Sequence, residues 1–246
     1  MPRVFLTAEW RYLAMLNYRV EPSLLAPYVP AGTSLDAWRG ETYVSVVGFL
    51  FRDTRLLGVP VPFHRHFEEV NLRLYVRRTV GGEVRRGVTF IRELVPRVAI
   101  AAVARAAYNE PYRALPMRHR IGPLRAPGAT PEVVEYGWRQ GAAWGGLRVE
   151  PAGEPEPLRS GSEEEFITEH YWGYTAQRDG STVEYRVEHP RWRTWRVDRS
   201  ALEGDLTELY GPAFARVLAE PPASAFLAEG SPVTVFAPTR LPAHRD

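Results

Sequence analysis

The sequence predicts a mainly β protein, built as a barrel or a sandwich of antiparallel strands. Three observations support this prediction. Many segments are rich in β-branched and aromatic residues, and most of them alternate between apolar and polar positions. Turns that contain glycine separate these segments into pairs, as in β-hairpins. Segments with helical periodicity are few.

The predicted strands begin with one buried strand and continue as three hairpins. The segment "YVSVVGFLF" (Tyr43–Phe51) is almost continuously apolar, as is typical of a strand with both faces covered. Alternating segments flank Gly81-Gly82, a second pair flanks Gly141, and a third pair flanks Asp179-Gly180. The segments "RWRTWRV" and "SPVTVFAP" supply further strands toward the C-terminus.

Three helical segments are expected beside the strands. The short segment "EPSLLAPYV" has Pro22 at a position that a first helical turn tolerates. Apolar residues follow a 3.6-residue period from Val95 to Ala106, which predicts about three helical turns. This helix is expected to end near Tyr108, because the residue before Pro111 is disfavoured in a helix. The segment "TELYGPAFARVLAE" predicts a late helix.

The stretch from Pro151 to Glu165 is polar and rich in proline and glycine. We interpret it as a surface loop rather than a domain linker, because the hairpin pattern continues on both sides of it. Residues 1–246 are therefore expected to form a single domain. Neither a signal peptide nor a membrane-spanning window is apparent, so we expect a cytoplasmic protein without a membrane partner.

The amino-acid composition excludes several classes of protein. The chain has no cysteine, which excludes disulfides, thiolate metal sites and thiol nucleophiles. It has no lysine either, so alone it cannot act as a Schiff-base enzyme, a pyridoxal phosphate enzyme or a P-loop NTPase. The motifs G-x-S-x-G and H-E-x-x-H are also missing, and no cofactor is predicted. The formal net charge is only +2, so no nucleic-acid partner is expected.

One predicted strand, "HRHFEEVNLRLYV" (His64–Val76), carries most of the candidate chemistry. Alternation places His64 and His66 on one face, and two imidazoles at this spacing beside a carboxylate form a metal-ligand pattern. We predict no metal and keep this pair as the weak alternative, because two-residue spacing recurs by chance. The other face presents four hydrogen-bonding side chains that either line a pocket or face solvent: Glu69, Asn71, Arg73 and Tyr75.

Two further side chains are candidates on chemical grounds. Arg105 falls on the apolar stripe of its predicted helix, where a guanidinium must pair with an acid such as Glu69 or Glu110, or hold an anion. His170, in "ITEHYWGY", is either a general acid or base or an ordinary strand histidine with its hydrogen bonds satisfied.

Several segments together resemble the YqjF-like family of bacterial proteins, whose function is unknown. They cover most of the chain and include "LNYRVEPSLLAPYVPAG", "YVSVVGFLFRDTR", "FEEVNLRLYV", "AAVARAAYNEPYR", "EHYWGYT", "EYRVEHPRW" and "SAFLAEGSPV". The family resembles acetoacetate decarboxylase in fold. This resemblance implies a single closed, cone-like antiparallel β-barrel with a pocket inside and a few short peripheral helices.

The distant resemblance to the decarboxylases also implies where the pocket residues lie. The segment Ala102–Arg105 matches the start of the decarboxylase segment that carries the Schiff-base lysine, and Pro111 matches its proline. Tyr112 then stands at the position of that lysine, and Arg113 stands at the position of the neighbouring lysine that lowers its pKa. Tyrosine cannot form an imine, so decarboxylation by the family's mechanism is excluded.

The same resemblance places Arg11 on a pocket arginine and Glu69 on a pocket glutamate, whereas a second family glutamate, expected in "YVSVVGF", is missing. Tyr112 and Glu69 are therefore the catalytic candidates. The ligand-binding candidates are Arg11, Asn71, Arg105, Arg113 and His170.

These groups suit a small ligand that bears a carboxylate or a carbonyl, because a guanidinium holds an anion while a phenol or carboxyl anchors a proton. The first functional hypothesis is therefore binding of such a molecule. A second is a lysine-independent enzyme, an acid/base lyase, isomerase or hydrolase of small organic acids that uses Tyr112 and Glu69. A third is a structural or regulatory protein with a vestigial pocket. Each of these hypotheses is compatible with a homo-oligomer.

Overall fold

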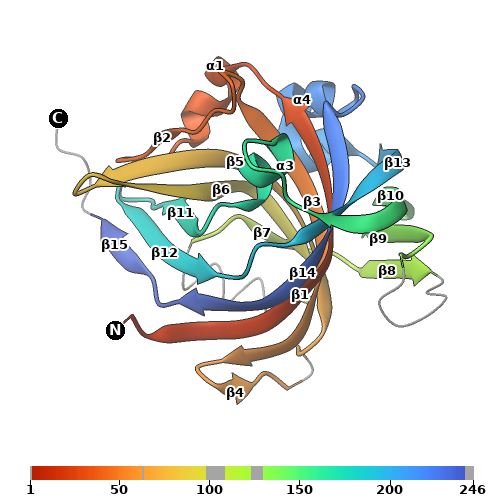
Figure 1. Ribbon diagram of the computed structural model, residues 1–246, viewed down its shortest axis with the longest axis horizontal. Helices are drawn as coiled ribbons and strands as arrows, with labels where there is room; N and C mark the ends of the chain where they lie inside the picture. The colour runs from red at the N-terminus through yellow and green to blue at the C-terminus, as the bar shows by residue number, and fades with distance from the viewer. Residues whose placement is uncertain (1, 63, 98–108, 123–129, 242–246) are drawn as a thin grey trace.

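Long antiparallel strands form one continuous, strongly curved sheet (Figure 1). The computed structural model describes residues 2–62, 64–97, 109–122 and 130–241. Within these ranges the strands follow the order β15-β12-β11-β6-β5-β3-β1-β14-β13-β10-β9-β8, and β2, β4 and β7 pair at the side of this path. The strands are β1 (Val4–Arg19), β2 (Ser34–Leu35), β3 (Tyr43–Leu56), β4 (Val59–Pro60), β5 (Phe67–Val80), β6 (Glu83–Val95), β7 (Tyr112–Ala114), β8 (Met117–Gly122), β9 (Val133–Gln140), β10 (Ala143–Pro157), β11 (Trp172–Ala176), β12 (Thr182–Glu188), β13 (Arg193–Glu203), β14 (Ser224–Phe236) and β15 (Thr239–Leu241).

The mainly β prediction is confirmed, and so are the three hairpins. Strands β5 and β6 meet at Gly81-Gly82, β9 and β10 meet at Gly141, and β11 and β12 flank Asp179-Gly180. Strand β12 also pairs with β14, through Val187↔Val235 and its neighbouring residue pair, although the two strands lie far apart along the main path. The same sheet therefore contacts itself at a second place.

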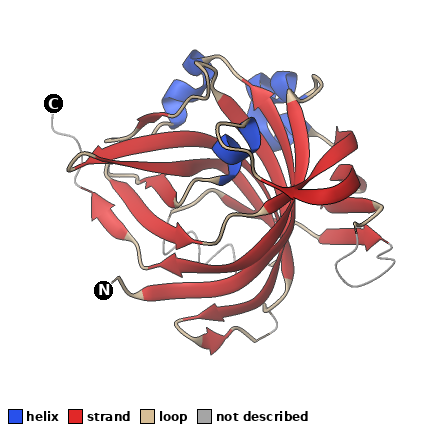
Figure 2. Ribbon diagram, in the orientation of Figure 1, coloured by secondary structure: helices blue, strands red, loops and turns tan. Residues whose placement is uncertain are grey.

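The described helices are few, and all of them lie in the upper half of the view in Figure 2. They are α1 (Pro22–Leu25), the 3₁₀ turn η1 (Ala26–Tyr28), α3 (Glu163–Thr168) and α4 (Leu206–Leu218). Two of the three predicted helical segments, the short N-terminal one and the late one, are confirmed by α1 and α4, and α4 bends at Gly211 before Pro212. None of the described helices is long and apolar enough to cross a membrane.

One local prediction needs correction, and another falls largely outside the described residues. The stretch Pro151–Glu165 is not a loop throughout: β10 runs through its first half, and α3 begins near its end, where the Ser162 hydroxyl accepts from the Glu165 N–H at 3.2 Å. A serine N-cap followed three residues later by glutamate is the local signal for this helix. Val95, the start of the predicted middle helix, belongs to β6, and the rest of that prediction falls largely on residues 98–108, outside the described residues.

The two faces of the long strands bury two different apolar clusters. On β5, Val70, Leu72 and Leu74 join the larger cluster, and α4 packs against the same cluster. The other face of β5 turns toward a second cluster that contains Phe67 and Tyr75. The alternation of a strand thus separates a solid core on one face from the region that holds the cavity described below.

A bulge in β1 decides which of its residues reach that cavity. Tyr12 has a φ of 55°, and the register with β3 shifts between Arg11 and Ala14. Trp10 precedes the bulge and Leu13 follows it, yet both side chains line the cavity. The Tyr136 hydroxyl from β9 donates a 2.7 Å hydrogen bond to the Tyr12 carbonyl oxygen and so holds the bulge in place.

A glycine in β3 leaves room for that tyrosine. A Cβ added at Gly48 would lie 2.6 Å from Tyr136 Cδ2 and 2.9 Å from Leu147 Cδ2, and both of these side chains are buried. We therefore expect Gly48→Ala to lower the free energy of unfolding by about 1–3 kcal/mol, the usual cost of overpacking a core. Gly122→Ala is the matched control, because its Cβ would meet neighbours only at 3.7 Å or more. Urea unfolding measures both changes, and equal stability of the two variants would contradict the proposed packing.

Candidate functional site

A cavity of about 290 Å³ lies between the strands on the side of the second apolar cluster. Its walls are largely aromatic and include Trp10, Phe49, Phe51, Phe90 and Trp192. Its lining also contains a smaller number of carboxyl, phenol, amide and imidazole groups. A mostly apolar cavity with a few convergent polar groups is the usual form of a small-molecule site.

Three adjacent strands place polar side chains in a row at one end of this cavity. In the sheet register Asn71 of β5 lies opposite Glu93 of β6, and Glu93 lies opposite Tyr112 of β7. Glu69 precedes Asn71 by two residues and so shares its face of β5. The Glu69 carboxylate accepts hydrogen bonds from Tyr112 Oη at 3.1 Å and from Asn71 Nδ2 at 3.0 Å.

A second carboxyl, Glu110, lies just before β7 and is bound by side chains from β11 and β12. Tyr185 Oη donates to Glu110 Oε1 at 2.5 Å, and Thr175 Oγ1 donates to the same oxygen at 3.5 Å. Gly173 makes this arrangement fit, because a Cβ there would lie 2.1 Å from the Tyr185 ring carbon Cζ. We call Glu69, Glu93, Glu110, Tyr112 and Tyr185 the acid cluster.

Burial makes the acid cluster hard to ionise. Burial raises the pKa of Glu69 to about 7, against the lowering effect of its bonds to Asn71 and Tyr112. It raises the pKa of Glu110 to about 7 as well, against its bond to Tyr185. The pKa of Glu93 is raised well above its ordinary range, first by burial and then by repulsion from Glu110 and Glu69. At neutral pH the cluster therefore keeps protons on some of its carboxyls.

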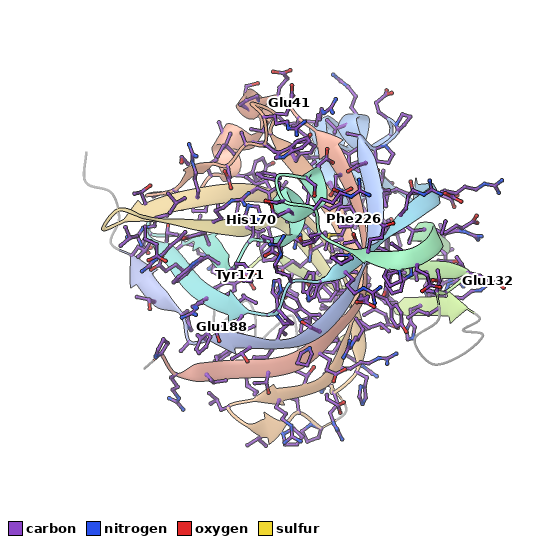
Figure 3. All side chains as sticks on the ribbon, viewed as in Figure 1. Glu41, Glu132, His170, Tyr171, Glu188 and Phe226 are labelled. Atoms are coloured by element: carbon purple, nitrogen blue, oxygen red, sulfur yellow. The ribbon has the colours of Figure 1, made fainter. Side chains whose placement is uncertain are left out.

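A different polar group, built on His170, lines the cavity away from the acid cluster. His170 Nε2 lies 3.2 Å from Asp36 Oδ2, and the same oxygen accepts from Arg86 Nε at 2.7 Å. Burial lowers the pKa of His170 to about 4, so the ring is neutral at physiological pH. Figure 3 shows His170 near the middle of the view, whereas Glu41 and Glu132 lie toward the outer edges.

Half of the buried side-chain polar atoms that lack a hydrogen-bond partner in the described residues belong to residues that line this cavity. In the part of the chain that the structure describes, five of its lining residues have such an atom, and native proteins rarely leave these groups unpaired. The atoms are Trp10 Nε1, Thr54 Oγ1, Asn71 Oδ1, Glu93 Oε2 and His170 Nδ1. The site therefore offers hydrogen-bonding capacity that its own residues do not use.

The structure brings together some of the residues predicted from the sequence. Glu69, Asn71, Tyr112 and His170 all line the cavity. Arg73 lines it too, but its guanidinium donates to the Ile167 carbonyl oxygen at 3.2 Å and to Tyr75 Oη at 3.4 Å.

The structure does not bring the predicted arginines to the cavity lining. Arg11 lies on the opposite side of β1 from Trp10, where it bonds Glu9 Oε2 at 3.0 Å. Arg113 follows Tyr112 in β7, points the other way and pairs with Glu208 of α4 at 2.5 Å. The expectation that both are pocket residues is not supported. Arg105 lies outside the described residues.

The weak metal alternative also gains no support from its geometry. His64 lines the cavity mouth, with Nδ1 2.7 Å from the Pro62 carbonyl oxygen, whereas His66 is exposed and accepts from the Asp53 N–H at 3.4 Å. Both residues precede β5, so they do not share a strand face as predicted. Among the described residues, no group of three or more histidines and acids is placed to hold a metal ion.

Sequence reasoning did not find Glu93 as a site residue, and it took Glu110 only as a partner for Arg105. Glu93 escapes the alternation pattern because β6 contains a bulge. The register between β5 and β6 skips Ile91, so Phe90 and Glu93 face the same cavity although they are an odd number of residues apart. The available signal was a glutamate next to Arg92 in a strand end whose other residues are apolar, "FIRELV". Such a residue is rarely buried without a special role.

The fold is that of the acetoacetate decarboxylases and related enzymes. The acetoacetate decarboxylase from Legionella pneumophila has a TM-score of 0.66 and 13% identity, over 98% of this chain and 88% of that one. The enduracididine biosynthesis enzyme MppR, in complex with pyruvate, has a TM-score of 0.67 and 12% identity, over 100% of this chain and 93% of that one.

Sequence comparison then assigns the family. Residues 7–233 match the DUF2071 family, described as an uncharacterized conserved protein, and the chain belongs to this family. The uncharacterized protein YqjF of Bacillus subtilis (strain 168) is 26% identical over 204 residues, which cover 82% of this chain and 80% of YqjF. The predicted resemblance to YqjF-like proteins with a decarboxylase-like fold is therefore confirmed.

The acid cluster predicts an unusual pH dependence of stability. The pKa of Glu69 is about 7 in the folded protein against an ordinary value of 4.5, so between these values the folded chain keeps a proton that the unfolded chain has lost. This carboxyl therefore makes stability fall as pH rises through that window. Glu69→Gln removes the effect, and its stability relative to wild type should increase by on the order of 3 kcal/mol between pH 4.5 and pH 8.

Urea unfolding at a series of pH values measures this difference. Glu203→Gln, at an exposed position in β13, removes one formal charge from the surface and serves as the control. A difference between Glu69→Gln and wild type that stays constant with pH, or falls as pH rises, would contradict the raised pKa.

Proposed function

We propose that this protein binds a small organic molecule that carries a carbonyl-type hydrogen-bond acceptor. The acceptor lies against the acid cluster, and the apolar body of the molecule lies between the aromatic walls. The observation that carries the proposal is the set of five unpartnered polar atoms around one cavity of about 290 Å³. A bound molecule would supply the missing hydrogen bonds.

The charge state of the acid cluster favours a carbonyl over a carboxylate. A protonated carboxyl is a hydrogen-bond donor and suits a neutral acceptor oxygen, while Tyr112 Oη, which donates to Glu69, orients that carboxyl. A carboxylate would instead approach three acidic residues, while Arg11 and Arg113 lie elsewhere and Arg73 already bonds protein oxygens. The sequence-based hypothesis named a ligand with a carboxylate or a carbonyl, and of these two groups the carboxylate fits the cavity less well. MppR, a protein of this fold, is in complex with pyruvate, which carries a ketone next to a carboxylate and so is compatible with either half of the hypothesis.

We further propose that the sheet closes into the predicted cone-like barrel. The supporting observation is the β12–β14 pairing, which joins two strands that the main strand order separates. A single domain over residues 1–246, a cytoplasmic location and the oligomeric state remain predictions, and no nucleic-acid partner is proposed.

The second candidate function is a lysine-independent acid/base enzyme. It is favoured by the pKa of about 7 for both Glu69 and Glu110, because a general acid or base works best when its pKa lies near the working pH. Tyr112 would orient Glu69 through their hydrogen bond, and Glu69 would exchange a proton with the carbon next to the carbonyl. A vestigial, filled pocket is disfavoured by the open cavity beside Tyr112.

Matched aromatic probes test the binding proposal. Acetophenone and 4-phenylbutan-2-one carry a carbonyl on an apolar body, whereas ethylbenzene and butylbenzene lack it. We expect both ketones to quench the fluorescence of Trp10 and Trp192 and to bind at least fivefold more tightly than the hydrocarbons, because one hydrogen bond contributes about 1 kcal/mol.

Two tyrosine variants complete this test. Tyr112→Phe should weaken ketone binding about fivefold, whereas Tyr174→Phe removes a buried phenol outside the cavity and should leave binding unchanged. Equal binding of ketones and hydrocarbons, or no binding of any probe, would overturn the proposal. Native mass spectrometry of the purified protein should also detect a copurified molecule.

The enzymatic candidate has a separate readout. If Glu69 exchanges a proton with a bound ketone, the methyl protons of acetophenone should exchange with D₂O in the presence of the protein, as seen by NMR. Glu69→Gln should lower that exchange rate by about 100-fold or more, the usual contribution of a general base. Ketone binding without any exchange above the buffer rate would leave binding as the function and exclude this one.

A further inference from the structure

We infer that His170 forms a second recognition point in the cavity, a fixed acceptor that selects ligands with a hydroxyl or N–H group remote from the carbonyl. This inference rests on the proposed function, because it assigns the other polar end of the same ligand. The chemical class it implies is a hydroxy- or amino-substituted ketone with an apolar body between its two polar groups.

The contacts of Asp36 fix the imidazole and its hydrogen. Asp36 Oδ2 accepts from Arg86 Nε at 2.7 Å, and Oδ1 accepts from the Ala37 N–H at 3.1 Å. Although burial favours the neutral acid, the bonds from His170 and Arg86 lower the pKa of Asp36 below its ordinary value, so this carboxylate is ionised. An ionised carboxylate only accepts hydrogen bonds. His170 Nε2 must therefore carry the hydrogen of this contact, and the neutral ring has a bare lone pair on Nδ1.

The environment of Nδ1 leaves this lone pair without a partner in a residue that lines the cavity. The His170 side chain is 1% exposed, and Nδ1 has no hydrogen-bond partner among the described residues. His170 nevertheless lines the cavity. Its ring packs against Tyr75, with ring centroids 4.7 Å apart, and edge-on against Phe166 at 5.2 Å. The acceptor is therefore buried, unused and held in one orientation.

The two polar ends are spaced along one strand. The acid cluster begins at Glu69 and Asn71 of β5, and His170 packs on Tyr75 of the same strand face. Four residues of extended strand, from Asn71 to Tyr75, span on the order of 13 Å between backbones. Between them Arg73 donates to Ile167 and Tyr75, and the neighbouring strand β6 places Phe90 beside Arg73 and Val88 beside Tyr75. The acid cluster and the His170 acceptor thus occupy separate positions along β5, with Arg73, Val88 and Phe90 between them.

Two hydroxyl-bearing ketones of different length test the inference on the wild-type protein. 4-Hydroxyacetophenone and 4-(4-hydroxyphenyl)butan-2-one are each compared with the ketone that lacks the hydroxyl and with the corresponding methyl ether. We expect the hydroxyl to improve the dissociation constant of at least one of the two by about fivefold or more, since it donates to Nδ1. The methyl ether has no donor and should lose that gain.

Two variants locate the effect. His170→Phe keeps a ring of similar shape without an acceptor, so the ratio between the dissociation constants of the plain ketone and the hydroxyl-bearing ketone should fall to less than twofold. Asp36→Asn can accept through its amide oxygen or donate through its amide nitrogen, so it should reduce the preference partially. A readout that needs no variant is the ¹⁵N resonance of His170 Nδ1, which should shift with the hydroxyl-bearing probe and stay in place with the plain ketone.

The outcomes separate this inference from the proposed function. If plain ketones bind but the hydroxyl adds nothing at either length, or if the preference survives in His170→Phe, this inference is overturned and the binding proposal stands. If no ketone binds at all, the binding proposal falls, and the assignment of His170 falls with it.

Discussion

The burial of three carboxyl groups in one small volume is the constraint on which the site depends. Glu69, Glu93 and Glu110 are each less than a tenth exposed, and ionising all three together would place like charges in a region of low dielectric. The protein meets this constraint by keeping protons on the cluster and by directing the hydroxyls of Tyr112 and Tyr185 at its oxygens. The consequence is a cavity end that donates hydrogen bonds at neutral pH although its side chains are formally acidic.

Irregular backbone, rather than the regular strands, determines which side chains meet there. The bulge at Tyr12 turns both Trp10 and Leu13 toward the cavity and leaves Arg11 on the other side of β1. The bulge at Ile91 does the same for Phe90 and Glu93. Bulges re-aim side chains in this way in many sheets, often beside functional sites. Without the second bulge, Glu93 would belong to the solid core that packs against α4.

The sequence predicts the strands well and the site only in part, and the bulges explain the difference. Alternation within β5 is local, so Glu69 and Asn71 were recognised as sharing a face that either lines a pocket or meets solvent. The resemblance to the decarboxylases added Tyr112, which a single short strand carries to the same cavity. The same resemblance placed Arg11 and Arg113 in the pocket, but a bulge and a one-residue alternation turn them away. The proximity of Glu93 and Glu110 depends on pairing between β5, β6 and β7, which no local pattern contains.

The missing lysine and the acid cluster are two aspects of the same physical situation. In a decarboxylase, as the resemblance implies, two lysines at the positions of Tyr112 and Arg113 would place positive charge near the pocket glutamate and favour its ionised form. Here the first position holds a neutral phenol, and the second directs its guanidinium to Glu208 on the opposite side of β7. The described pocket thus has less positive charge for its carboxyls, and burial raises the pKa of Glu69 and Glu110 to about 7. Under the proposed function, a site that in a decarboxylase would hold a keto acid through an imine binds a neutral carbonyl here through donated hydrogen bonds.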